Sequence, residues 1–285
     1  MAKSPLKQKT HRISYKVTVS GTVLASKYHV VFVEVDTKLN KLPYATVEIL
    51  DGDTSEQKFE KLDDLNLNPG DDIKIEVGYH EQNKVIFEGI ITSIGTGGDF
   101  GSHGRTTIEA TDKCKAMTVN RKSRYFKGKK DSQIVSEIIR DYSGVTSKQD
   151  STPTTHKKIV QYASSDWDFL LSRATVSKRV IVVEKNKYNF VEPGGSSSVK
   201  LEYGFDIVDF NINVDASNQL KKVTIKGWNP STHSFQTGSS SEPGFDKQGN
   251  SKMKGDKLAS NLKYKDETLR TTTPMETSEL NDYAA

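Results

Sequence analysis

The sequence predicts a mainly β protein with a small α/β segment in its middle. Many short runs alternate apolar and polar residues with a period of two, which is typical of strands with one wet face. Turn residues such as Asp51-Gly52 and Pro69-Gly70 separate these runs. Helical spacing of apolar residues is found mainly in two stretches, near residues 131 and 166. The 285 residues are enough for two ordinary domains.

The first 120 residues are predicted to be strands. In the clearest run, Ile73, Ile75 and Val77 alternate with charged or small residues. Short connections between about seven strands are typical of a sandwich or a barrel. We therefore expect a tail over residues 1–11 and a first β domain over 12–120. The main predicted strands are 13–19, 28–35, 45–50, 73–79, 85–94 and 106–111.

Residues 121–178 are predicted to form the α/β segment. A first helix starts at Asp131 or Ser132, which can cap it, and Gly144 is placed to end it. A short strand near 158–161 leads into a second helix, in the stretch YASSDWDFLLSRA. The segment thus supplies two helices between two β regions.

The second helix contains two acids, Asp166 and Asp168, which raises the question of a catalytic carboxylate pair. Residues two apart on a helix point about 200° apart, so these two cannot act together on one face. Ser165 and Asp168 instead have the spacing of a capping box. The packing anchors predicted for this helix are Trp167, Leu170 and Leu171.

Strands resume after residue 178, and 179–285 is predicted to be a second, incomplete β domain. A polar loop rich in Ser, Gly, Lys and Asn is expected over 229–260. A final helix is expected to start near Thr277. The predicted strands are 179–184, 188–191, 205–215, 219–228 and 262–269.

Composition limits the possible functions. The formal net charge of +4 is mild for this length, so bulk charge does not call for a nucleic-acid partner. A mean hydropathy of -0.62 indicates much polar surface. A single cysteine, Cys114, excludes an internal disulfide and fits folding in a reducing compartment. The sequence shows no signal peptide and no apolar run of about 20 residues that could span a bilayer.

No active site is predicted. The six histidines have no partner at metal-ligand spacing, and no nucleophile elbow or paired-acid motif supports a hydrolase. We therefore expect no enzyme activity, no catalytic residues, no metal, no cofactor and no small-molecule substrate.

The most unusual charge feature is the stretch 113–130, which holds eight Lys or Arg residues and no acid. With Tyr125 and Phe126 among them, these cations suggest two hypotheses. One is docking onto an acidic protein surface. The alternative is a nucleic-acid-binding module that uses 113–130 to follow a single strand. The mild net charge favours the protein partner. The candidate contact residues are Arg121, Lys122, Arg124, Lys127, Lys129 and Lys130.

The order of motifs resembles one known family. The stretch YASSDWDFLLSRA lies between two predicted strands, after NPGDDIKIEVGY, VIFEGII and a basic stretch that follows Ala110-Thr-Asp112. Over roughly residues 12–228 this pattern resembles the VgrG spike proteins of type VI secretion systems. It also resembles the hub proteins of contractile phage baseplates, including the late control protein D group.

This resemblance implies two related β-barrels of the baseplate hub type, joined by the α/β segment. It implies a homotrimeric ring that adapts the tail tube of a contractile injection machine to its spike and takes part in effector delivery. The implied partners are an Hcp-like tube protein, baseplate proteins, and a PAAR-type tip with effectors through a C-terminal part beyond residue 285. The implied localisation is the bacterial cytoplasm during assembly, followed by secretion or injection.

Overall fold

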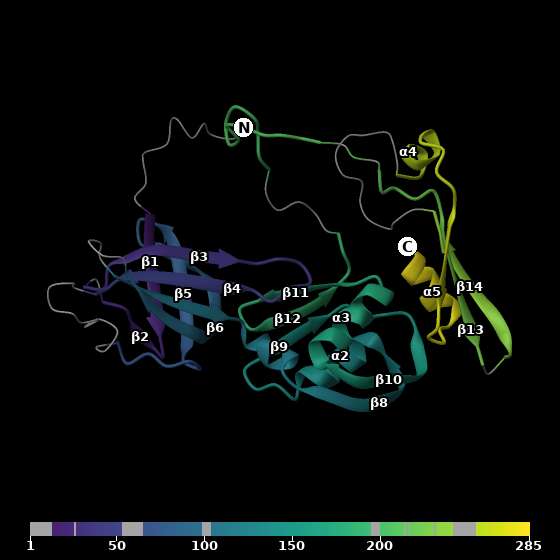
Figure 1. Ribbon diagram of the computed structural model, residues 1–285, viewed down its shortest axis with the longest axis horizontal. Coiled ribbons are helices and arrows are strands. Elements are labelled where there is room, and N and C mark those ends of the chain that lie inside the picture. The colour runs from purple at the N-terminus through teal and green to yellow at the C-terminus, as the bar shows by residue number, and fades with distance from the viewer. Residues whose placement is uncertain are drawn as a thin grey trace.

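The computed structural model describes residues 13–285 except 26, 53–64, 99–103, 195–199, 214, 216, 231 and 242–254. Three units follow one another along the chain: a large sheet, an α/β segment, and a small sheet with helices (Figure 1). The predicted mainly β class with an α/β segment in the middle is confirmed. The predicted tail over 1–11 lies outside the described residues.

The first unit is a seven-stranded sheet in the order β2-β1-β5-β6-β7-β4-β3. The sheet curls, so β3 and β4 cross β1 and β5 around an apolar core (Figure 1). Val47, Ile75 and Ile108 have no exposed surface there. Among the described residues β2 and β3 do not pair with each other, so the expected barrel is an open, curled sheet. The strands are β1 Ile13–Val19, β2 Thr22–Val23, β3 Val30–Asp36, β4 Tyr44–Leu50, β5 Asp72–Tyr79, β6 Gln82–Gly97 and β7 Arg105–Thr111.

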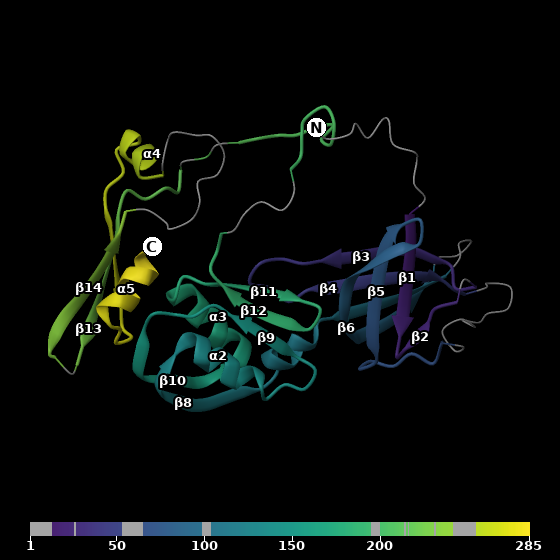
Figure 2. The same ribbon diagram turned by 180° about the vertical axis from the view of Figure 1, so that it is seen from behind.

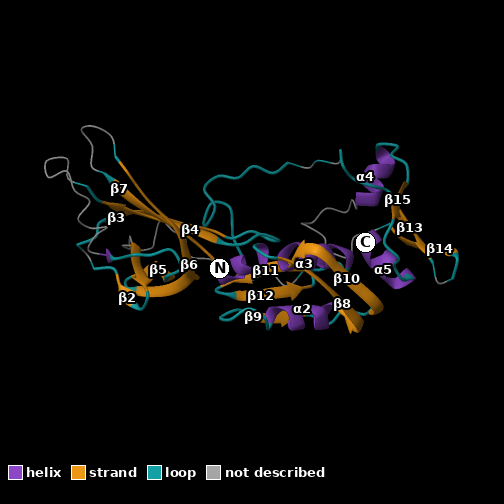
Figure 3. Cartoon of the chain, turned by 60° about the horizontal axis from the view of Figure 1, so that its bottom comes forward, coloured by secondary structure: helices purple, strands orange, loops and turns teal. Residues whose placement is uncertain are grey.

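The α/β segment packs two helices and a short 3-10 helix against two small sheets (Figure 3). One sheet pairs β8 with β10, and the other has the order β11-β12-β9. Ile138 of α2, Leu170 of α3 and Phe190 of β12 are fully buried in the common core. The elements are η2 Lys113–Thr118, β8 Arg121–Lys130, α2 Asp131–Ile139, β9 Thr146–Gln149, β10 Thr155–Ser165, α3 Asp166–Val176, β11 Val180–Glu184 and β12 Lys187–Val191.

Two of the predicted strands belong to a different unit than expected. The sequence assigns 179–184 and 188–191 to a second β domain that starts at residue 179. In the structure β12 pairs in parallel with β9, with Lys187 opposite Thr146, so both strands complete the α/β segment. The reason is packing, since Ile181 and Tyr188 are buried in that segment's core.

The C-terminal unit is a three-stranded sheet in the order β14-β13-β15, with α5 against it. Backbone meets backbone where α5 crosses β14, because a Cβ at Gly238 would lie 2.3 Å from the carbonyl carbon of Leu280. Glycine is the residue that permits such an approach. The elements are β13 Val223–Asn229, β14 Ser234–Ser240, α4 Gly255–Asn261, β15 Glu267–Thr271 and α5 Thr277–Ala284.

Two expectations for this unit were wrong. The polar loop expected over 229–260 contains β14, which forms a hairpin with β13, and most of α4. The strand expected over 205–215 is absent, because in its described part the only β contact is an isolated bridge between Tyr203 and Ile207. An alternating sequence becomes a strand only when a neighbouring edge accepts its backbone hydrogen bonds.

The packing of α3 leads to a stability prediction. Trp167 is 7% exposed and meets the Tyr188 ring edge-on, with ring centroids 6.0 Å apart. We expect Trp167→Ala to lower the free energy of unfolding by about 3–5 kcal/mol in urea titrations. The matched control is Trp228→Ala, whose side chain is 44% exposed and should cost much less. Equal losses in both variants would contradict this account of α3.

Candidate partner-binding surface

The β8–β10 pair forms a two-stranded ribbon on the outer side of the α/β segment, below α2 and α3 in Figure 1. Strand alternation sorts its residues by face. Lys122, Arg124 and Phe126 point toward the segment, whereas Arg121, Tyr125 and Lys127 are exposed. The basic strand β8 therefore supplies inward side chains that contact the segment and outward side chains that form an exposed face.

The outward face combines aromatic, apolar and basic groups. Tyr125 is 67% exposed, Val160 57% and Tyr162 81%. Lys158 lies directly opposite Lys127 in the ribbon, and its Nζ is 5.3 Å from the centre of the Tyr125 ring. Neither strand contains an acidic residue. Exposed aromatic and apolar groups beside cations are typical of an interaction site.

Tyr162 lies at a β-bulge on this face. Tyr162 and Ala163 together oppose the single residue Ser123, and Ala163 has a φ of 45°. The bulge is held by a hydrogen bond from the backbone N–H of Ala163 to Ser123 Oγ, at 3.0 Å. Tyr162 points outward, as Val160 does two residues earlier, while Gln161 between them is 1% exposed.

A single buried carboxylate, Asp166, anchors the ribbon from inside. Its side chain is 0% exposed. Its oxygens accept four hydrogen bonds of 2.5 to 2.8 Å, from Lys122 Nζ, Arg124 Nη2, Tyr142 Oη and Gln161 Nε2. Burial by itself would raise the pKa of Asp166, but these donors outweigh it and lower the pKa below its ordinary value. Asp166 is therefore a structural anion that fixes β8 and β10 to α3.

The start of α3 follows the capping geometry. The Asp168 N–H donates to Ser165 Oγ at 3.1 Å, and Ser165 Oγ donates to Asp168 Oδ2 at 2.6 Å. Trp167 and Leu170 lie in the buried core, and Leu171 packs against it half-buried. Asp166 also binds Lys122, Arg124 and Tyr142, which lie 24 to 44 positions earlier in the chain, and no local spacing reveals these partners.

The six contact candidates fall into two groups. Arg121 and Lys127 are exposed on the outward face. The others have roles inside the segment: Lys122 and Arg124 bind Asp166, Lys129 pairs with Glu137, and the backbone N–H of Lys130 donates to Gln133 at the start of α2. That any of the six touches a partner stays a prediction. The sequence hypothesis missed Lys158, Val160 and Tyr162, which strand pairing brings to the same face.

A second buried network connects the α/β segment to the C-terminal unit. Arg173 Nε lies 2.7 Å from Asp131 Oδ1, and Arg173 Nη2 lies 2.6 Å from Glu279 Oε1. His156 Nε2 lies 2.9 Å from Asp131 Oδ2. Burial raises the pKa of Asp131, but the hydrogen bonds from His156 and Arg173 outweigh it, so the pKa is lowered. These residues come from α2, β10, α3 and α5.

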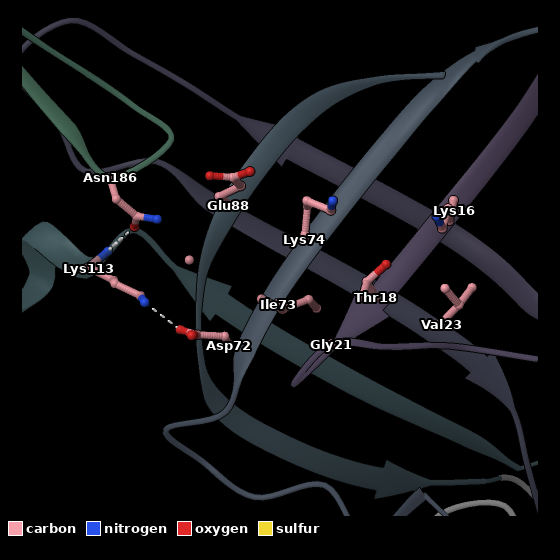
Figure 4. Close-up of a pocket in the computed structure, with 11 residues that line it drawn as sticks. Lys16, Thr18, Gly21, Val23, Asp72, Ile73, Lys74, Glu88, Lys113 and Asn186 are labelled. Atoms are coloured by element: carbon pink, nitrogen blue, oxygen red, sulfur yellow. Dashed lines mark hydrogen bonds and ion pairs between the residues drawn. The ribbon is translucent and has the colours of Figure 1, made fainter. Parts of the chain in front are cut away.

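A pocket of 410 Å³ lies on the first sheet beside the α/β segment (Figure 4). Lys113 Nζ points to Asp72, 2.6 Å away, and the Lys113 N–H donates to Asn186 Oδ1. Two further lysines there, Lys16 and Lys74, lie 3.8 Å from Glu76. Because each of these lysines has an acidic neighbour, the pocket offers little net positive charge to an anion. The contact of Lys113 with Asp72 joins the first sheet to the α/β segment.

Two further findings concern the described part of the chain. It contains no group of three or more His, Cys, Asp or Glu side chains placed to hold a metal ion. It also contains no helix long and apolar enough to cross a membrane.

The Asp166 network predicts different effects for two neighbouring arginines. Arg124→Glu would place a carboxylate beside the buried Asp166, and we expect a loss of about 3 kcal/mol or more in the free energy of unfolding. Arg121→Glu reverses an exposed charge and should change the free energy of unfolding by less than about 0.5 kcal/mol. Urea titrations that give equal midpoints would contradict the inside–outside sorting of β8.

The lowered pKa values of Asp131 and Asp166 predict acid sensitivity. Each carboxyl binds its proton more weakly in the folded chain than in the unfolded chain. Its contribution to the free energy of unfolding is therefore full above the ordinary carboxyl pKa of about 3.9 and is lost as the pH falls further. We expect the free energy of unfolding to decline from about pH 5 downward. Asp166→Asn should be less stable at neutral pH and lose part of this slope. A variant curve parallel to that of the native chain would contradict this.

The fold has known relatives. A prophage MuSo2 43 kDa tail protein from Shewanella oneidensis is 10% identical, with a TM-score of 0.66 over 95% of this chain and 76% of that one. A tail protein from Neisseria meningitidis MC58 is 12% identical, with a TM-score of 0.61 over 95% of this chain and 74% of that one. A chain of the Francisella PdpA–VgrG complex is 13% identical, with a TM-score of 0.52 over 93% of this chain and 44% of that one.

At these identities the likeness shows a shared fold, and the resemblance to phage tail and type VI spike proteins holds at that level. No curated protein matches the sequence. The family model described as the Alg8 N-terminal domain matches residues 9–285, nearly the whole chain, and it is a different family from VgrG. The chain therefore belongs to the Alg8 N-terminal domain family.

Proposed function

We propose that this chain is a structural subunit of a contractile, phage-tail-like injection machine. The observation that carries the proposal is the fold shared with two tail proteins over 95% of the chain. In this role the chain forms a homotrimeric ring between an Hcp-like tube and the spike, contacts baseplate proteins, and takes part in effector delivery. A PAAR-type tip and effectors are further proposed partners of the assembled spike. The chain would assemble in the bacterial cytoplasm and be secreted or injected with the machine.

The ribbon supports this role, because a scaffold acts through its surfaces. Its outward face carries Tyr125, Val160 and Tyr162 beside Lys127 and Lys158, and no acidic residue in either strand neutralises them. We propose that this face contacts another protein subunit of the assembly. The same face also favours a second candidate, a nucleic-acid-binding module, because exposed tyrosines can stack on bases while lysines pair with phosphates.

The test is particle assembly in the source bacterium. Sheathed particles are isolated by sedimentation and probed for this chain. We expect the chain to sediment with the tube and sheath proteins, and a deletion strain to yield no complete particles. Particles that form normally without the chain would overturn the proposal. A chain that stays in the supernatant and is retained with single-stranded nucleic acid at low salt would favour the second candidate.

A further inference from the structure

The segment 201–213, here called the acidic segment, begins with a turn at 202–207 and continues as an unpaired stretch with an uncovered apolar row. Val208 is 90% exposed, Phe210 52% and Ile212 76%. Its charged residues are all acids, Glu202, Asp206 and Asp209, and no lysine or arginine occurs between Lys200 and Lys221. Its sequence alternates as a strand does, yet it pairs with no strand in the described part of the chain. Such a row normally marks an interaction site.

The ribbon face has the opposite charge and the same apolar character. Lys127 and Lys158 stand directly opposite each other, and like charges in that position are unfavourable. Neither lysine forms an ion pair within the described residues. An acidic partner would relieve the repulsion between them, and Tyr125, Val160 and Tyr162 would supply apolar contact.

Length and position indicate what covers the ribbon face. The six residues 208–213, which follow the turn, would span about 20 Å when extended, about two thirds of the roughly 33 Å of a ten-residue strand such as β8. In Figures 1 and 2 the acidic segment, in green, runs along the upper side of the molecule, while β8 and β10 lie along the lower side. In this arrangement a chain does not cover its own ribbon.

We infer that the acidic segment of one copy of this chain docks on the ribbon face of a second copy. Acids of one copy meet Lys127 and Lys158 of its neighbour, and Phe210 and Ile212 pack near Tyr125. The two surfaces differ, so the contact is head-to-tail, and such contacts close into a ring when the rotation permits. This inference rests on the proposed function, since it names the subunit that the ribbon face contacts.

Paired charge reversals test the contact on the purified chain. One variant carries Glu202→Lys and Asp209→Lys, and the other carries Lys127→Glu and Lys158→Glu. Each alone should weaken self-association by about tenfold or more in sedimentation velocity, because like charges then face each other. An equal mixture of the two should regain association between unlike variants, since each reversed surface finds an opposite charge on the other variant. A closed ring of three would still keep one contact between like variants, so the recovery is scored on the unlike pair. The control Lys84→Glu with Lys187→Glu makes the same charge change at exposed sites elsewhere and should associate normally.

Disulfide trapping gives a second, independent test of the contact. The native Cys114 is 0% exposed, so added surface cysteines react selectively. Mixing Tyr125→Cys chains with Phe210→Cys chains should give a disulfide-linked pair, whereas Phe210→Cys with Ile86→Cys should not. A monomeric native chain, a variant mixture that does not recover, or equal yields from both cysteine pairs would overturn the inference. If the chain still sediments with particles in that case, the proposed function stands and only the partner is wrong.

Discussion

A single buried guanidinium, Arg173, holds the second half of the chain together. It forms ion pairs with Asp131 from the start of α2 and with Glu279 from α5, residues that are 148 positions apart in the sequence. All three side chains are at most 7% exposed, so removing the cation would leave Asp131 with only His156 and Glu279 without its nearest partner, in a dry site. A small apolar cluster with Val176, Ile225 and Leu280 lies between the same elements. The Arg173–Glu279 ion pair therefore ties α5, which packs on the C-terminal sheet, to the α/β segment.

The ribbon uses the same principle on a smaller scale. Strand alternation turns Lys122 and Arg124 inward, where Asp166 satisfies them, and turns Tyr125 and Lys127 outward. The inner half makes the ribbon rigid, and a rigid surface loses less entropy when it binds. Inward anchoring side chains and exposed side chains thus alternate along one basic stretch. A summed charge for that stretch hides the division, because only the exposed cations are available to a partner.

Local patterns predicted the parts of this structure that local forces determine. Alternation located most strands of the first sheet, and the Ser165–Asp168 spacing located the start of α3. The sequence patterns did not predict which distant segments pair with each other. Nothing near 180–191 indicates that these strands join β9, and nothing near Asp166 indicates that Lys122 lies 44 positions earlier as its partner. The failed strand over 205–215 is informative, since its pattern is that of a strand and its neighbour is missing.

The burial of Cys114 determines what the only thiol of the chain can indicate about the compartment and the dynamics of the protein. Its side chain lies in the α/β core with no exposed surface, and burial raises its pKa well above the ordinary range. A thiol in that state is neither ionised nor reachable, so oxidants outside the cell would leave it unchanged while the core is closed. Cysteine content therefore does not indicate the compartment in which this protein works. The rate at which a thiol reagent labels Cys114 instead measures how often the α/β core opens.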